Sequence, residues 1–153
     1  MIFRVTMIGH YWDRVPQYQI IVDGDVQLEG EIKQPSGQPD SFDFDIPDLP
    51  DGPHKISIRF NNKTDDQTVK DQYEDPNNYT IVKDMTLEVV SIEIDTIDLG
   101  SLIWNGLYHP DHPVEYKGES NVSEIPFCLN MGWNGSFDLE FGTPLYLWLL
   151  ESL

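Results

Sequence analysis

The sequence predicts an all-β fold, a single antiparallel jelly-roll-like β-sandwich that spans residues 1–153. Short runs alternate apolar and polar residues, turns rich in Gly and Pro separate these runs, and helical periodicity is almost absent. Such alternation gives each strand one apolar face, and a sandwich buries these faces against one another. No internal repeat and no linker interrupts the pattern, so we expect one domain.

The alternating runs place the expected strands along the chain. They cover residues 3–7, 18–22, 26–30, 42–46, 54–60, 87–95 and 137–141. Asp23-Gly24-Asp25 suits a tight hairpin between the second and third runs, because Gly tolerates positive φ. At the C-terminus, Thr143 followed by Pro144 is typical of a helix start, and a short helix is expected there, with a last strand as the alternative.

Two stretches break the alternation, and we expect no regular structure in them. Residues 61–78 are long, polar and rich in carboxylates, whereas residues 104–133 are rich in aromatics, His, Pro and Asn. Long loops are uncommon in compact domains and often carry function.

The chain is strongly acidic. Lys and Arg number 9 against 27 Asp and Glu, which gives a formal net charge of -18. Phosphate backbones and anionic membranes should repel such a chain, so we expect no nucleic-acid partner and no membrane partner. Cations, basic protein surfaces or neutral sugars suit it better, and the alternative is that the acidity only maintains solubility.

Cysteine content and the N-terminal residues predict a chain that is made in the cytoplasm. Cys128 is the single cysteine and lies in an apolar run, so we expect a buried, unreactive thiol. Met1 opens an alternating run, with no cationic stretch followed by an apolar signal core. No apolar run approaches the length of a membrane span.

The polar stretch contains the oxygen-bearing side chains that calcium prefers. Calcium takes six to eight oxygen ligands, mostly carboxylates mixed with carbonyls and amides. We predict a calcium site from four residues, Asn62, Asp65, Asp66 and Asp71. A solvated acidic loop is the alternative, and no EF-hand pattern is present. His109 and His112 suggest a transition metal less strongly, because the prolines beside them argue against a shared helix face.

No catalytic motif is found, so we expect no enzyme activity and no required cofactor. A phosphate-binding glycine loop, a nucleophile elbow and a zinc-protease helix are all missing from the sequence. Aromatic side chains that flank loops are candidates for stacking on a sugar ring, namely Tyr73, Tyr79, Trp104 and Tyr108. The alternative is that they pack in the core or under loops.

The C-terminal segment is the candidate contact with a protein partner. Apolar side chains follow one another from residue 145 to residue 150, and a small sandwich covers only part of such a segment. The predicted contact residues are Leu145, Tyr146, Trp148 and Leu149. The alternative is that the segment closes one end of the sandwich.

Residues 51–62 resemble a segment of calcium-dependent xylan-binding modules, in which Asp-Gly and a His precede an alternating strand that ends in Asn. A strand similar to residues 84–95 follows in that family, and the resemblance covers roughly residues 20–100. It implies a jelly-roll sandwich whose calcium helps to hold sugar hydroxyls. The chain departs from the pattern at Asn62-Lys63, where the family commonly has Asn-Asp, and at Met85-Thr86, where it commonly has Arg-Asn.

Residues 92–103, 132–136 and 143–151 resemble small proteins encoded by tailed bacteriophages. This resemblance runs nearly the length of the chain and implies a virion protein made in the host cytoplasm. We therefore expect a non-enzymatic phage structural protein, a capsid decoration or tail-associated protein that contacts other virion proteins or itself. The alternative is a calcium-dependent carbohydrate-binding module that contacts glycans on the host surface. A cytoplasmic accessory or inhibitor protein, acidic enough to mimic nucleic acid, is a third reading.

Overall fold

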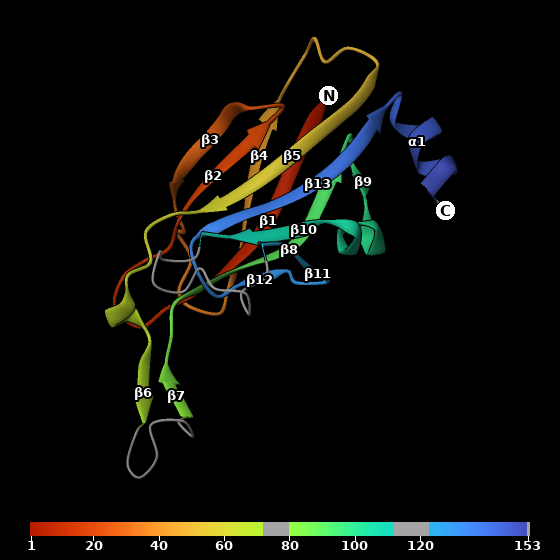
Figure 1. The fold of residues 1–153 in the computed structure, drawn as a ribbon. Coiled ribbons are helices and arrows are strands. Elements are labelled where there is room, and N and C mark those ends of the chain that lie inside the picture. Colours follow the sequence, from red (N-terminus) through yellow and green to blue (C-terminus); the bar gives the residue numbers. More distant parts are fainter. Residues whose placement is uncertain (72–79, 112–122, 153) are drawn as a thin grey trace.

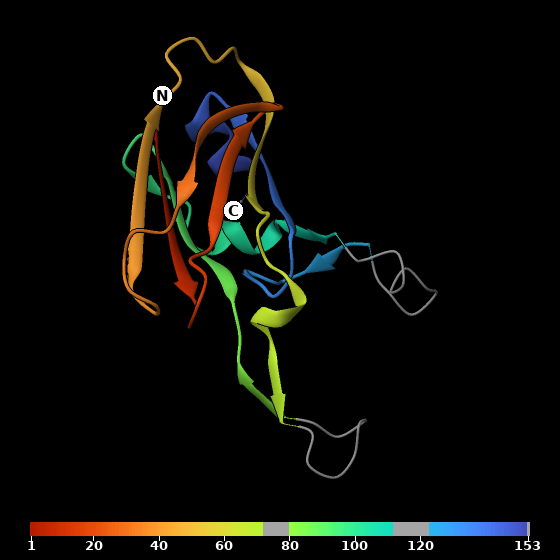
Figure 2. The ribbon, with the colours of Figure 1, turned by 90° about the vertical axis from the view of Figure 1, so that its left-hand side faces the viewer.

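The computed structural model describes residues 1–71, 80–111 and 123–152. Two antiparallel sheets lie face to face, and a two-stranded hairpin projects from one end of this sandwich (Figures 1 and 2). The predicted antiparallel β-sandwich is therefore confirmed. Its organisation as one domain stays a prediction, for which a single cooperative transition in chemical denaturation is the expected result.

The alternating runs of the sequence form the long strands, and short strands complete each sheet. The first sheet contains β1 (Ile2–His10), β4 (Pro39–Asp45), β8 (Thr86–Ile94), β9 (Ile97–Asp98) and β12 (Asn130–Met131). The second contains β2 (Gln17–Val22), β3 (Asp25–Glu31), β5 (Gly52–Phe60), β10 (Leu107–Pro110), β11 (Ile125–Pro126) and β13 (Gly135–Thr143). The projecting hairpin is β6 (Val69–Asp71) with β7 (Thr80–Lys83). The helices are η1 (Asp65–Gln67), η2 (Gly100–Asn105) and α1 (Leu145–Ser152).

Strand order places the core between the two sheets. The first sheet runs β12-β8-β1-β4 with β9 beside β8, and the second runs β11-β10-β13-β5-β2-β3. On β1, Phe3, Val5 and Met7 are fully buried, whereas Arg4 faces outward. The Arg4 guanidinium donates to both carboxylate oxygens of Asp43 on β4, at 2.8 and 3.0 Å. Period-two alternation thus sends apolar side chains inward and charged ones to solvent.

The predicted hairpin at residues 23–25 is confirmed. Val22 pairs with Asp25, and the two residues between them, Asp23 and Gly24, have φ of 50° and 86°. Positive φ at both central positions is the requirement of the hairpin turn that Asp-Gly favours. The Asp23 carboxylate also accepts from the ring of buried His54, at 2.6 Å from Nδ1. This contact joins the hairpin turn to β5.

The two stretches that break the alternation are more regular than expected. Residues 61–78 include η1 and β6, and β7 follows the residues that the structure does not describe. Residues 104–133 include the end of η2 and the strands β10, β11 and β12. Of these strands, β11 and β12 escape sequence analysis because they have 2 residues each, which is too short for alternation to be visible.

The C-terminal segment forms the helix α1, as one of the two alternatives predicted. Thr143 is not its N-cap, because this residue ends β13 and its hydroxyl donates to the carbonyl of Pro50 at 2.8 Å. The first helical hydrogen bond runs from Trp148 N to Pro144 O at 3.2 Å. No helix in the described part of the chain is long and apolar enough to cross a membrane.

Candidate functional site

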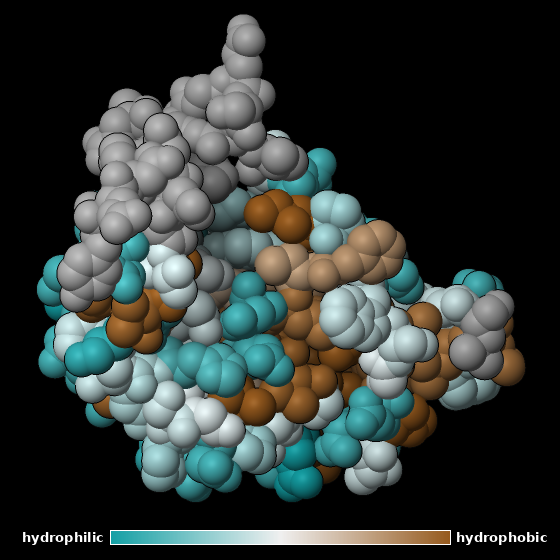
Figure 3. Space-filling view, turned by 90° about the horizontal axis from the view of Figure 1, so that it is seen from below, coloured by the Kyte–Doolittle hydropathy of each residue, from teal (hydrophilic) through white to brown (hydrophobic). Residues whose placement is uncertain are grey.

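A groove with aromatic walls opens beside β8, between η2 and the segment that links β11 to β12. Its volume is about 580 Å³, within the range of small-molecule sites. Figure 3 shows apolar side chains gathered in a hollow on this face. We call it the Trp104 groove, and it is lined by Glu88, Val89, Val90, Ser91, Asp98, Gly100, Ile103, Trp104, Phe127, Cys128, Leu129 and Asn130.

The helix η2 presents Trp104 to the groove. Leu102 and Ile103 of this helix are buried in the core and anchor it, while Trp104 is 45% exposed. The turn before the helix is held by Asp98, whose carboxylate accepts from the backbone N of Gly100 at 2.8 Å. An anchored helix with an exposed indole provides a rigid aromatic surface.

Phe127 lines the same groove in an unusual backbone conformation. Its side chain is 71% exposed, and its φ is 56°. A residue with a Cβ pays about 1–2 kcal/mol to adopt this left-handed region, and such strain is concentrated at functional sites. The neighbouring Cys128 thiol donates to Asn130 O at 3.3 Å, and burial raises the pKa of this thiol. Cys128 is partly exposed in the groove and not fully buried, which corrects its predicted burial.

Polar groups border the apolar floor of the groove. Carboxylates of Glu88 and Asp98, the hydroxyl of Ser91 and the amide of Asn130 all line it. The Glu88 carboxylate also contacts His10, with Oε1 at 3.1 Å from Nε2. Aromatic faces can stack on the apolar C–H surface of a sugar ring while carboxylates and amides bond its hydroxyls. The groove therefore has the chemistry of a saccharide site.

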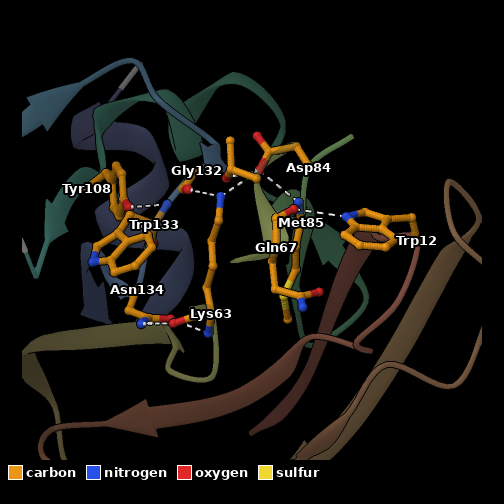
Figure 4. Close-up of polar contacts among 10 residues, drawn as sticks. Trp12, Lys63, Gln67, Asp84, Met85, Tyr108, Gly132, Trp133 and Asn134 are labelled. Carbon is orange, nitrogen blue, oxygen red and sulfur yellow. Dashed lines mark hydrogen bonds and ion pairs between the residues drawn. The ribbon is translucent and has the colours of Figure 1, made fainter. Parts of the chain in front are cut away.

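An ion pair between a buried lysine and a partly buried aspartate lies just before β8, at the base of the β6–β7 hairpin (Figure 4). The Lys63 ammonium donates to Asp84 Oδ1 at 2.7 Å and to Gly132 O at 2.6 Å. The same Asp84 oxygen accepts from the Thr68 hydroxyl at 2.7 Å and from Met85 N at 2.8 Å. We call these five residues the Lys63 cluster.

The Asp84 carboxylate is the anion of the Lys63 cluster, and its protonation should govern the strength of the pair. Burial alone would raise the pKa of Asp84, but the hydrogen bonds from Lys63, Thr68 and Met85 outweigh it and hold this pKa below its usual value of 3.8. A lowered pKa in the folded state stabilises the fold above pH 3.8, and the contribution is lost as pH falls through the folded pKa.

We therefore expect an Asp84→Asn variant to be less stable than the unmodified protein near neutral pH, with the difference shrinking below pH 3.8. Urea denaturation at a series of pH values measures both free energies of unfolding. The exposed Asp48, changed to Asn, is the control and should show no such convergence. A difference that stays constant down to the acid transition would contradict the role of this carboxylate.

Two further residues hold the loops around the Lys63 cluster. Asn134 pairs with the backbone of Lys63 in both directions, accepting from its N at 2.8 Å and donating to its O at 2.9 Å. The Tyr108 hydroxyl donates to Trp133 O at 2.5 Å and accepts from Trp133 N at 3.1 Å. Burial raises the pKa of Tyr108 to about 12, against the lowering effect of the Trp133 hydrogen bond.

The structure does not gather the four predicted calcium ligands into one site. Asn62 uses both amide atoms inside the fold, donating to Val15 O and accepting from Gln17 N, each at 2.9 Å. Asp66 accepts from the Thr64 hydroxyl, and Asp65 begins η1. Asp71 lies farther along, at the end of β6. Across the described residues, no group of three His, Cys, Asp or Glu side chains could hold a metal ion.

The predicted sugar-stacking residues have different outcomes. Trp104 is exposed in the groove as the prediction requires, while its role there stays a prediction. Tyr108 is 3% exposed and cannot offer a ring face, which corrects its predicted role, because its hydroxyl is held by the Trp133 backbone. Tyr73 and Tyr79 lie outside the described residues, as does His112. His109 contacts two carboxylates, Asp138 at 2.9 Å and Glu124 at 3.3 Å.

The predicted partner residues divide between the two faces of α1. Leu145 is 7% exposed and belongs to the core, and Trp148 and Leu149 pack against that core. These three residues are thus turned at least partly inward, which corrects their predicted exposure. Tyr146 is exposed, and two leucines that were not predicted accompany it, Leu147 and Leu150. Contact of this face with a partner stays a prediction.

Sequence analysis missed Phe127 and Lys63. Phe127 lies in a short apolar run, which predicts a buried side chain, and nothing in that run indicates its positive φ. Lys63 has Asn, Thr and Asp as neighbours in sequence, and this polar surrounding predicts an exposed side chain. One signal was available for Lys63, since the resemblance to xylan-binding modules breaks down at this position.

Two solved structures share this fold. One is vCBM60 in complex with galactobiose, with a TM-score of 0.58 and 8% identity, covering 91% of this chain and 97% of that one. Another is the selenomethionine form of vCBM60, with a TM-score of 0.57 and 8% identity, covering 90% of this chain and 88% of that one. It is described as part of an evolutionary link, by circular permutation, between two families of calcium-dependent carbohydrate binding modules. No family model and no curated protein sequence matches the chain.

Calcium is the ion that this likeness implies, and the described residues do not fit it. At the predicted site, both amide atoms of Asn62 already form hydrogen bonds with the backbone of β2 and of the loop before it. The Asp84 carboxylate, at the same end of the sandwich, is already paired with the Lys63 ammonium of the chain itself. An ammonium among the donors repels a divalent ion. Binding of calcium elsewhere on the chain stays a prediction.

Proposed function

We propose that this chain is a non-catalytic carbohydrate-binding protein that holds a glycan in the Trp104 groove. The observation that carries the proposal is the pair of exposed aromatic side chains, Trp104 and Phe127, on one apolar groove bordered by carboxylates and an amide. The sandwich that supports them has the fold of a carbohydrate-binding module over most of its length. A net charge of -18 favours neutral sugars over anionic ones.

Each aromatic residue would contribute by stacking on a sugar ring. Phe127 projects with most of its surface free, and Trp104 is fixed by the anchored residues of η2. Glu88, Ser91 and Asn130 would bond hydroxyl groups at the rim, where water competes for them. Affinity would then depend on the rings, and the choice among sugars on the polar groups.

We expect Trp104→Ala and Phe127→Ala each to weaken glycan binding by at least about tenfold, because each removes a stacking surface. A glycan array gives the ligand, with galactobiose as the first saccharide tested, and isothermal titration calorimetry then compares the variants. Tyr146→Ala is the matched control, since Tyr146 is an exposed aromatic residue on α1, outside the groove. If the array shows no binding, the proposed carbohydrate function is wrong. If all variants bind with equal affinity, the glycan does not bind in the Trp104 groove.

A second candidate is the virion role predicted from the sequence, with the protein placed on a phage particle. The observation in favour of a partner contact is the outer face of α1, where Tyr146 is 64% and Leu150 is 68% exposed. Exposed apolar residues that cluster often mark an interaction surface. Mass spectrometry of purified particles tests this role, because a decoration protein would be abundant in them.

A further inference from the structure

Lys63 is buried to a degree that is rare for its residue type. Its side chain is 2% exposed, in a chain with only 9 Lys and Arg to balance 27 acidic residues. Lysine is almost never fully buried unless it is paired, because the ammonium loses its hydration. An exposed lysine would offset repulsion among the surface carboxylates. The burial of Lys63 therefore needs a structural reason.

The surroundings of the Lys63 ammonium are those of a bound cation. One charged oxygen of Asp84 and one neutral carbonyl oxygen of Gly132 accept from it, at 2.7 and 2.6 Å. Carboxylate and carbonyl oxygens are the donor types that hard metal ions take in proteins. Met85 N and the Thr68 hydroxyl also donate to Asp84 Oδ1, so groups other than the ammonium hold this carboxylate in position.

The cation joins three segments that are far apart in sequence. Lys63 follows β5, Asp84 lies between β7 and β8, and Gly132 lies between β12 and β13. Figure 4 shows the extended Lys63 side chain crossing from its own loop to the other two. The pair therefore closes the base of the β6–β7 hairpin and ties it to the turn before β13. A bound structural metal stabilises a fold in a comparable way, because its ligands come together only when the chain folds.

We propose that Lys63 supplies, from within the chain, the positive charge that organises this end of the sandwich in place of a bound divalent cation. The fold of this protein then needs no calcium, although a structural neighbour is described with calcium-dependent modules. The proposal does not rest on glycan binding in the Trp104 groove. It concerns only the ion that holds the loops together.

The first test uses the unmodified protein, by thermal unfolding in EDTA, in millimolar calcium and in millimolar magnesium. We expect the same melting temperature with and without EDTA, since a fold that contains no calcium loses no stability to a chelator. A melting temperature that falls in EDTA overturns the proposal, as does a rise in calcium above the value in magnesium that Asp84→Asn abolishes.

The second test changes the charge inside the cluster. Lys63→Met keeps the unbranched side chain up to the ε position and leaves Asp84 without its cation, so we expect a melting temperature lower by roughly 6–20 °C. Lys33→Met is the matched control at an exposed lysine and should change it by less than about 2 °C. Equal melting temperatures for the two variants overturn the proposal.

A double variant separates the charge from packing. Lys63→Met with Asp84→Asn removes both charges, so it should be more stable than Lys63→Met alone, because no carboxylate is left unpaired. If the double variant instead has a lower melting temperature than Lys63→Met, Lys63 acts by packing alone and the proposal fails. If Lys63→Met does not fold, the EDTA and calcium measurements on the unmodified protein still decide.

Discussion

Replacing Gly135 with alanine is expected to cost more than about 4 kcal/mol of folding free energy, a large fraction of the stability of an ordinary domain. A Cβ at this position would lie 2.3 Å from His109 O and 2.8 Å from Pro110 Cα. Both atoms belong to the backbone of β10, which pairs with β13 through Pro110 and Gly135. Backbone atoms within a sheet cannot turn aside as a flexible side chain can, so the strands would have to separate.

Gly132→Ala is the control for this prediction, since it lies three residues earlier on the same turn. No atom stands within 4 Å of its expected Cβ, and its carbonyl would still accept from Lys63. Urea denaturation followed by circular dichroism measures both variants against the unmodified protein. A Gly135→Ala protein as stable as Gly132→Ala would mean that β10 and β13 are less closely paired than the structure has them.

Removing residues 145–153 is expected to lower the free energy of unfolding by roughly 5 kcal/mol or more. Leu145 is buried, and the Trp148 ring packs edge-on against Phe141 of β13, with centroids 6.5 Å apart. The same indole covers Gly142, whose expected Cβ lies 3.1 Å from Trp148 Cδ1. The helix therefore shields the end of the second sheet, and its loss would expose core residues to water.

Point variants separate the inner face of α1 from its outer face. Leu145→Ala and Trp148→Ala should each cost about 2–4 kcal/mol, because each leaves a cavity against β13. Tyr146→Ala should change stability by less than about 0.5 kcal/mol, since its ring is exposed. If the truncated protein is as stable as the full chain, α1 is not part of the core, and its inner face has been assigned wrongly.

The sandwich was predictable because its determinants are local. Phe3, Val5 and Met7 alternate with polar residues, and the pleat of a strand converts that order into a buried face. Asp23-Gly24 marks its hairpin because few residues tolerate the required positive φ. In both cases a few neighbouring residues determine the local structure, so a single sequence is enough to predict it.

The candidate sites were less predictable because their residues meet only in three dimensions. Trp104 belongs to η2 and Phe127 to the segment after β11, and nothing between them in sequence indicates a shared groove. The strands that bring them there, β11 and β12, are too short to show a period. An exposed aromatic residue and a buried one also look alike in sequence, as Trp104 and Tyr108 demonstrate.

The sequence by itself determined the long strands, the first hairpin and the acidic character of this protein, since alternation, turn residues and charge are properties of adjacent residues or of simple composition. Only the tertiary structure decided which polar residues are buried and which aromatic residues are exposed. Lys63 has polar neighbours in sequence, yet it is buried because Asp84 and Gly132 reach it from distant loops. Burial depends on which segments pack together, and a cation or a ring takes its role from those segments.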